Sequence, residues 1–117
     1  MAPRILVVDD DTDIRETLRA ALVEAGYEVV VAADGREAMR SLSPRPALML
    51  LDLMMPGLDG WELLDELRRT APLASIPVCV LSAISSHAPP ATAAVLQKPI
   101  TLDQLLATVT RLCGPAR

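Results

Sequence analysis

Short apolar runs alternate with segments of helical periodicity along the whole chain. Runs of this length, rich in β-branched residues and closed by turn residues, are typical of buried strands, and apolar positions three or four residues apart are typical of amphipathic helices. The predicted strands are residues 4–8, 27–32, 47–52, 76–81 and 95–97. Because strands and helices follow one another in turn, the pattern predicts one α/β domain, a doubly wound five-stranded parallel sheet with helices on both faces.

The predicted helix starts share a capping signature, in which an acidic or hydroxyl residue is followed three positions later by Glu or Gln. The pairs are Asp13 with Glu16, Asp34 with Glu37, Asp59 with Glu62, and Thr101 with Gln104. The first side chain of such a pair accepts a hydrogen bond from a main-chain N–H that the helix leaves unpaired. Gly26 is expected to end the first helix.

The connection between the last two strands departs from this regular pattern. Ser82 and Val95 are 13 positions apart, and a crossover between parallel strands needs a dozen or more residues, usually with a helix. Pro89 and Pro90 disfavour a full helix there. We therefore expect a short or disordered fourth helix, in which His87 is a solvated loop residue.

Composition restricts the classes of function. At 117 residues the chain is large enough for one domain, 1–117, and too small for two. A formal net charge of −4 argues against direct binding of nucleic acid, which needs clustered basic residues. The chain has no apolar run long enough for a signal peptide or a membrane span, so we expect a cytoplasmic protein without a membrane contact. Its two cysteines are expected to be reduced thiols.

Charged or hydroxyl side chains stand at the end of four of the predicted strands or directly after it. Asp9 and Asp10 follow the first strand, Asp52 ends the third, Ser82 follows the fourth and Lys98 follows the fifth. Because the carboxyl ends of parallel strands meet at one edge, these side chains are expected together. Carboxylates at such short distances repel one another unless a cation neutralises their charge. Oxygen ligands favour Mg²⁺ or Mn²⁺.

The same set of side chains suits the transfer of a phosphoryl group. Asp52 can act as a nucleophile that accepts the phosphoryl group covalently. Lys98, the single lysine in a chain with ten arginines, supplies a compact ammonium for a phosphoryl oxygen. Ser82 supplies a hydroxyl donor.

With these motifs in this order, the chain resembles a response regulator receiver domain of two-component signalling over essentially its whole length. The motifs are Ile5-Leu-Val-Val-Asp-Asp10, Asp52-Leu-Met-Met-Pro-Gly-Leu-Asp-Gly60, Leu81-Ser-Ala83 and Lys98-Pro99. The resemblance implies a flavodoxin-like, CheY-like fold with strand order 2-1-3-4-5 and a cis Lys98–Pro99 bond.

By resemblance, Asp52 accepts a phosphoryl group from a histidine kinase or phosphotransfer protein, and the domain is a switch and not an enzyme, with slow Mg²⁺-dependent loss of the group. Asp10, Asp52 and the main-chain carbonyl of Met54 are implied to bind the metal, and Asp9 to act through metal-bound water. The kinase is expected to dock at Ile14, Arg15, Leu18 and Pro99. Output is expected through a downstream protein effector or through self-association.

Two features differ from the pattern of the family. Val95 stands where the family usually has an aromatic residue, and the segment between Ser82 and Lys98 is shorter than usual. We therefore expect the phosphorylation chemistry to be kept and its conformational response to be altered.

Two other classes of protein were weighed. A pseudo-receiver would be an interaction module that never becomes phosphorylated and fails to bind Mg²⁺. A small aspartyl-phosphate hydrolase would use Asp9 and Asp11 as its paired acids, but it needs a substrate cap that this chain cannot supply, and it leaves the Asp52 loop unexplained.

Overall fold

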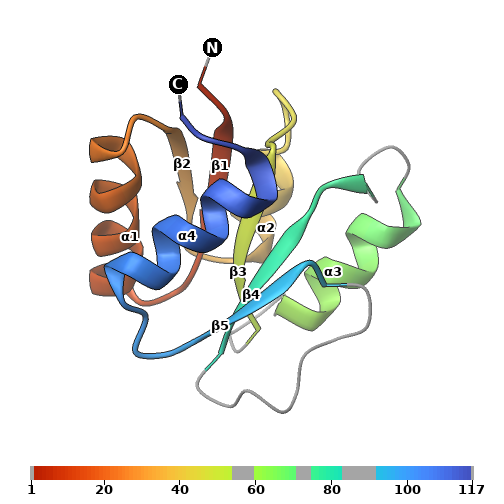
Figure 1. Cartoon of the computed structure of the whole chain (residues 1–117). Helices are drawn as coiled ribbons and strands as arrows, with labels where there is room; N and C mark the ends of the chain where they lie inside the picture. Colours follow the sequence, from red (N-terminus) through yellow and green to blue (C-terminus); the bar gives the residue numbers. More distant parts are fainter. Residues whose placement is uncertain (1, 54–59, 71–74, 83–91, 117) are drawn as a thin grey trace.

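The computed structural model describes residues 2–53, 60–70, 75–82 and 92–116. Within these residues, five strands and four helices follow one another along the chain (Figure 1). The strands are β1 (Arg4–Val8), β2 (Glu28–Ala32), β3 (Leu48–Asp52), β4 (Val78–Ser82) and β5 (Ala94–Gln97). The helices are α1 (Thr12–Glu24), α2 (Gly35–Arg40), α3 (Gly60–Arg69) and α4 (Leu102–Cys113).

All neighbouring strands are parallel, and the sheet has the order β2-β1-β3-β4-β5. Val8 pairs with Leu51 across β1 and β3, and Asp52 pairs with Leu81 across β3 and β4. The strand ends are therefore level with one another, which places the residues that follow them at one edge. The predicted parallel sheet and its strand order are both confirmed.

Alternate side chains of each strand enter two separate cores. Ile5 and Val7 of β1 pack in the core beneath α1 and α4, and Leu6 and Val8 pack in the core beneath α2 and α3. Figure 1 shows these two pairs of helices on opposite faces of the sheet. β3 is buried at every position, because both of its faces are covered, as expected for a central parallel strand.

Two of the predicted helix caps are confirmed. The carboxylate of Asp34 accepts a hydrogen bond from the N–H of Glu37 at 2.9 Å, and the Thr101 hydroxyl accepts one from the N–H of Gln104 at 3.2 Å. Gly26 follows the end of α1 with a φ of 104°, which glycine adopts without the strain that a side chain would bring.

The predicted cap of α1 is wrong. The helix begins at Thr12, one residue before the predicted cap Asp13, so Asp11 is the N-cap. Its carboxylate accepts hydrogen bonds from the N–H groups of Asp13 and Ile14 at 2.9 and 3.2 Å. Glu16 pairs with Arg19 one turn further along the helix.

Several expectations concern residues outside the described ranges. They are the cap at Asp59, the carbonyl of Met54, His87 and most of the short or disordered helix expected between Ser82 and Val95, which is not α4. In the part of the chain that the structure describes, no helix is long and apolar enough to cross a membrane.

Candidate functional site

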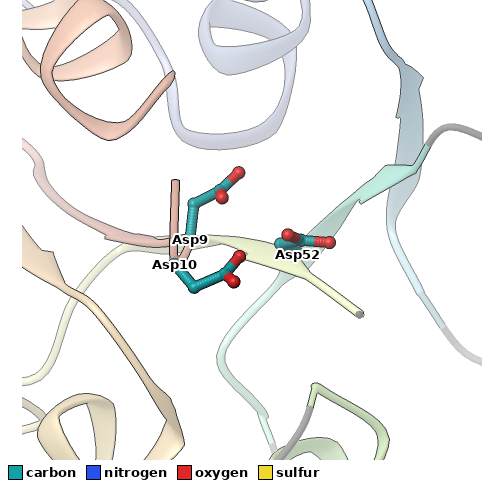
Figure 2. Close-up of side chains that lie close together, drawn as sticks. All are labelled: Asp9, Asp10 and Asp52. Atoms are coloured by element: carbon teal, nitrogen blue, oxygen red, sulfur yellow. The ribbon is translucent and has the colours of Figure 1, made fainter. Parts of the chain in front are cut away.

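Three aspartates form a cluster at the carboxyl edge of the sheet. Asp9 and Asp10 leave β1 and Asp52 ends β3, and the carboxylates of Asp9 and Asp10 are turned toward the side on which Asp52 lies (Figure 2). One oxygen from each of the three lies within 4.8 Å of the other two. Asp9 is 0% and Asp52 6% exposed, and Asp10 is exposed. The predicted gathering of these carboxylates is therefore present.

Lys98 brings a cation to the cluster from the end of β5. Its main-chain N–H donates to the carbonyl of Ser82 at 2.8 Å. Its Nζ lies 3.1 Å from Oδ2 of Asp9 and 3.4 Å from Oδ2 of Asp52. Burial of the ammonium acts against its charge, but the contact with Asp9 and the charge of Asp52 outweigh burial, so the pKa of Lys98 is raised above its ordinary value. The bond from Lys98 to Pro99 is cis, as the resemblance implies.

Ser82 reaches the same edge at the end of β4. In the register of the sheet, its neighbour Leu81 pairs with Asp52, and Ser82 itself pairs with Gln97, the residue before Lys98. The hydroxyl-bearing residue is half-buried and lies between the strands that carry Asp52 and Lys98. The structure thus brings together five of the six predicted site residues, and the sixth, Met54, lies outside the described ranges.

The loop between β1 and α1 is held by hydrogen bonds of its own. Oδ1 of Asp9 accepts from the N–H of Asp11 at 2.9 Å, and the main-chain N–H of Asp9 donates to the carbonyl of Ala32 at 3.2 Å. Nη1 of Arg15 donates to the main-chain carbonyl of Asp9 at 2.8 Å. The sequence analysis named Arg15 only as a docking candidate and missed this contact. The helix dipole disfavours a cation near the start of a helix, so an arginine at this position could have indicated a role outside the helix.

The cluster fits a hard divalent cation. Oδ2 of Asp9 is buried, and the Lys98 ammonium that reaches it at 3.1 Å is shared with Oδ2 of Asp52 at 3.4 Å. One ammonium shared between two buried carboxylates leaves negative charge at the cluster that a further cation would neutralise. Three carboxylates face one ammonium, their donor atoms are all oxygens, and the exposed position of Asp10 leaves room for the waters that Mg²⁺ keeps.

A groove of about 270 Å³ lies beside the cluster, between α1 and the turn that follows Lys98. Its apolar walls come from Ile14, Leu18, Pro99 and Ile100, and Asp13 and Lys98 add charge to its lining. Three of the four predicted kinase contacts, Ile14, Leu18 and Pro99, line this one groove.

Comparison with known proteins gives a consistent result. A family model described as the response regulator receiver domain matches residues 5–110. The response regulator MprA of Mycolicibacterium vanbaalenii is 44% identical over 119 residues, which cover 96% of this chain and 51% of that protein. The transcriptional regulatory protein PrrA of Mycobacterium bovis is 49% identical over 86 residues, 73% of this chain and 36% of that protein.

Solved structures of receiver domains are similar over nearly the whole chain. The chemotaxis response regulator CheY4 of Vibrio cholerae superimposes with a TM-score of 0.86 at 30% identity, covering 96% of this chain and 99% of that one. The signal receiver domain of a histidine kinase from Syntrophus aciditrophicus gives a TM-score of 0.84 at 33% identity, covering 96% of this chain and 90% of that one.

The fold and the acidic edge define a CheY-like signalling domain. The chain belongs to the response regulator receiver domain family of two-component systems. It spans about half the length of the MprA relatives that it matches.

Proposed function

We propose that this receiver domain accepts a phosphoryl group on Asp52 from the phosphohistidine of a histidine kinase or phosphotransfer protein, and that it acts as a switch. The observation that carries the proposal is the environment of the Asp52 carboxylate. It lies at the end of a buried strand, 3.4 Å from the Lys98 ammonium and within 4.8 Å of two further carboxylates.

The step is a displacement at phosphorus. An oxygen of Asp52 forms the new bond to phosphorus as the bond to the imidazole nitrogen of the donor breaks, and the leaving imidazole keeps the electron pair and takes a proton. Lys98 is placed to neutralise a phosphoryl oxygen, and Ser82 to donate its hydroxyl to another. Such transfers depend mainly on positioning and on stabilisation of charge.

The residues that would hold Mg²⁺ or Mn²⁺ are Asp9, Asp10 and Asp52, with the main-chain carbonyl of Met54 as a further proposed ligand. A bound ion would neutralise charge on the transferring oxygens. In this arrangement Asp52 would have two roles, because its carboxylate would be both nucleophile and ligand. Slow loss of the phosphoryl group to water, also dependent on the metal, would return the switch to its resting state.

The proposed partners are proteins. The groove lined by Ile14, Leu18 and Pro99 offers an apolar surface beside the phosphorylation site, which suits docking of the donor protein. A downstream effector or a second copy would read the phosphorylated state. We expect no direct contact of this domain with nucleic acid or membrane, since its net charge is −4, and we expect it to work in the cytoplasm.

The proposal is tested by intact-mass spectrometry after incubation with acetyl phosphate, with Mg²⁺ or with EDTA. The expected result is a gain of one phosphoryl group by the wild type with Mg²⁺ only. Asp52→Asn should gain none, and Asp65→Asn, which changes an exposed carboxylate of α3, should behave like the wild type. A folded wild-type protein that gains nothing would contradict the proposal and favour a pseudo-receiver.

A further inference from the structure

Arg15 contacts the loop that carries Asp9 and Asp10, the two aspartates of the proposed metal site that follow β1. Its Nη1 donates to the main-chain carbonyl of Asp9 at 2.8 Å, and its Nη2 lies 3.5 Å from the hydroxyl of Thr12. The side chain is half-buried. A cation this close to the start of α1 opposes the helix dipole, so helix stability does not account for its placement.

Asp9 and Asp10 are held in different ways. Asp9 is buried, and hydrogen bonds fix both its carboxylate and its main-chain N–H. The side chain of Asp10 is exposed and makes no hydrogen bond or ion pair in the part of the chain that the structure describes. Its direction toward Asp52 therefore depends on the main chain and on its own side-chain torsions, without a contact to another side chain.

The main chain at Asp10 is set by the peptide group that Arg15 contacts. The carbonyl of Asp9 and the N–H of Asp10 belong to one planar unit, so fixing the carbonyl fixes the plane from which Asp10 leaves. Without the guanidinium, this peptide could rotate, and the Asp10 carboxylate would no longer be held toward Asp52. The hydrogen bond from Arg15 thus adds to those that Asp9 makes with Ala32 and Asp11 in holding the main chain from which Asp10 leaves.

We infer that Arg15 is a positioning residue, which orients the Asp9–Asp10 peptide so that Asp10 is ready to bind the metal. The inference rests on the proposed function, because it takes Asp10 as a metal ligand. A role through charge would have the opposite sign, since a nearby guanidinium repels a divalent cation. Positioning predicts weaker metal binding when Arg15 is removed, and charge repulsion predicts tighter binding.

The test compares Mg²⁺ affinity by titration calorimetry in the wild type, Arg15→Met, Arg15→Lys and the control Arg19→Met. Arg19 is on the same helix but pairs with Glu16 at 3.0 Å. Groups that orient metal ligands typically contribute ten- to a hundredfold to affinity, so Arg15→Met should bind about tenfold more weakly. Arg15→Lys, which keeps a donor, should recover part of the loss, and Arg19→Met should match the wild type.

Two further readouts separate positioning from a general loss of structure. In the metal-free protein, ¹⁵N relaxation should show a more mobile Asp10 amide in Arg15→Met, with the amides of β1 unchanged. In phosphorylation by acetyl phosphate, the Mg²⁺ concentration for half-maximal rate should rise about tenfold, while the rate at saturating Mg²⁺ stays within about threefold. Acetyl phosphate is a small donor that needs no docking groove, so a role of Arg15 in contact with a partner protein would not affect this rate.

Equal or tighter Mg²⁺ binding by Arg15→Met, with an unchanged Asp10 amide, would overturn the inference. If Arg15→Met does not fold, Arg15→Gln and Arg15→Lys give the same readouts. A wild type that neither binds Mg²⁺ nor accepts a phosphoryl group would instead contradict the proposed function, and the mobility of the Asp10 amide would still show whether Arg15 holds the Asp9–Asp10 peptide.

Discussion

The two ends of the sheet carry charge in different ways. At the amino end, near both chain termini (Figure 1), Arg4 of β1 pairs with Glu28 of β2, and Arg45 lines the same surface pocket. At the carboxyl end, three carboxylates share Lys98. Cations thus match or exceed carboxylates around this pocket of the amino end, whereas the carboxyl end carries excess negative charge, which suits an external cation. The contrast supports the proposal that the carboxyl end carries the chemistry.

The largest expected effect is the loss of the cation at the carboxyl end. Lys98→Met should slow phosphorylation by acetyl phosphate at least about a hundredfold, the usual effect of removing one preorganised donor from a charged transition state. Arg4→Met removes a cation at the amino end and should leave the rate within about twofold. The initial rate of phosphorylation of each variant is measured by intact mass. Comparable slowing in the two variants would contradict the claim that only the carboxyl end carries the chemistry.

Neutralising a carboxylate should have opposite effects on stability at the two ends. Asp10→Asn relieves repulsion among the aspartates and should raise the metal-free free energy of unfolding by about 1 kcal/mol, while weakening Mg²⁺ binding. Glu28→Gln loses the exposed pair with Arg4 and should lower the free energy of unfolding by less than about 1 kcal/mol. Urea unfolding in EDTA measures both changes, and a destabilised Asp10→Asn would argue against repulsion at the cluster.

The amino end should affect stability without affecting chemistry. The Tyr27 hydroxyl donates to the carbonyl of Gly114 at 2.8 Å and so ties β2 to the segment after α4. Tyr27→Phe should lower the free energy of unfolding by about 1 kcal/mol, and Mg²⁺ affinity should not change. A shift in Mg²⁺ affinity measured by calorimetry would show that the two ends are coupled.

The smallest effect is confined to alkaline pH. The pKa of Lys98 is raised above its ordinary value of 10.5, so its ion pairs stabilise the fold fully below pH 10.5 and are lost as pH rises through the higher folded value. The difference in free energy of unfolding between wild type and Lys98→Met should be constant from neutral pH to about 10 and then shrink.

Cys79 titrates in the same range, because burial raises the pKa of its thiol to about 11, but its contribution cancels in this difference. A difference that already shrinks near neutral pH would contradict the assignment to Lys98. The pair formed by Arg4 should persist throughout, since a guanidinium stays charged in this range.

The sequence was enough to predict the sheet and the positions of the described candidate site residues. Buried apolar runs such as 48–51 end in charged or hydroxyl residues, and parallel pairing forces those ends to one edge. The predicted cap of α1 was wrong by two positions, because Asp11 and Asp13 both suit a helix start and sequence patterns locate helix boundaries poorly. The contacts of Arg15 with Asp9 and of Tyr27 with Gly114 depend on side-chain paths in the folded chain, which hydrophobic periodicity does not encode.

The most direct test of the central claim is to locate the phosphoryl group. After incubation with acetyl phosphate and Mg²⁺, borohydride reduction converts an aspartyl phosphate to homoserine, and peptide mass spectrometry identifies the changed residue. The account predicts homoserine at position 52 in the wild type and at no position in Asp52→Asn. Homoserine at position 9 or 10, or an unmodified Asp52 in protein that has gained a phosphoryl group, would contradict it.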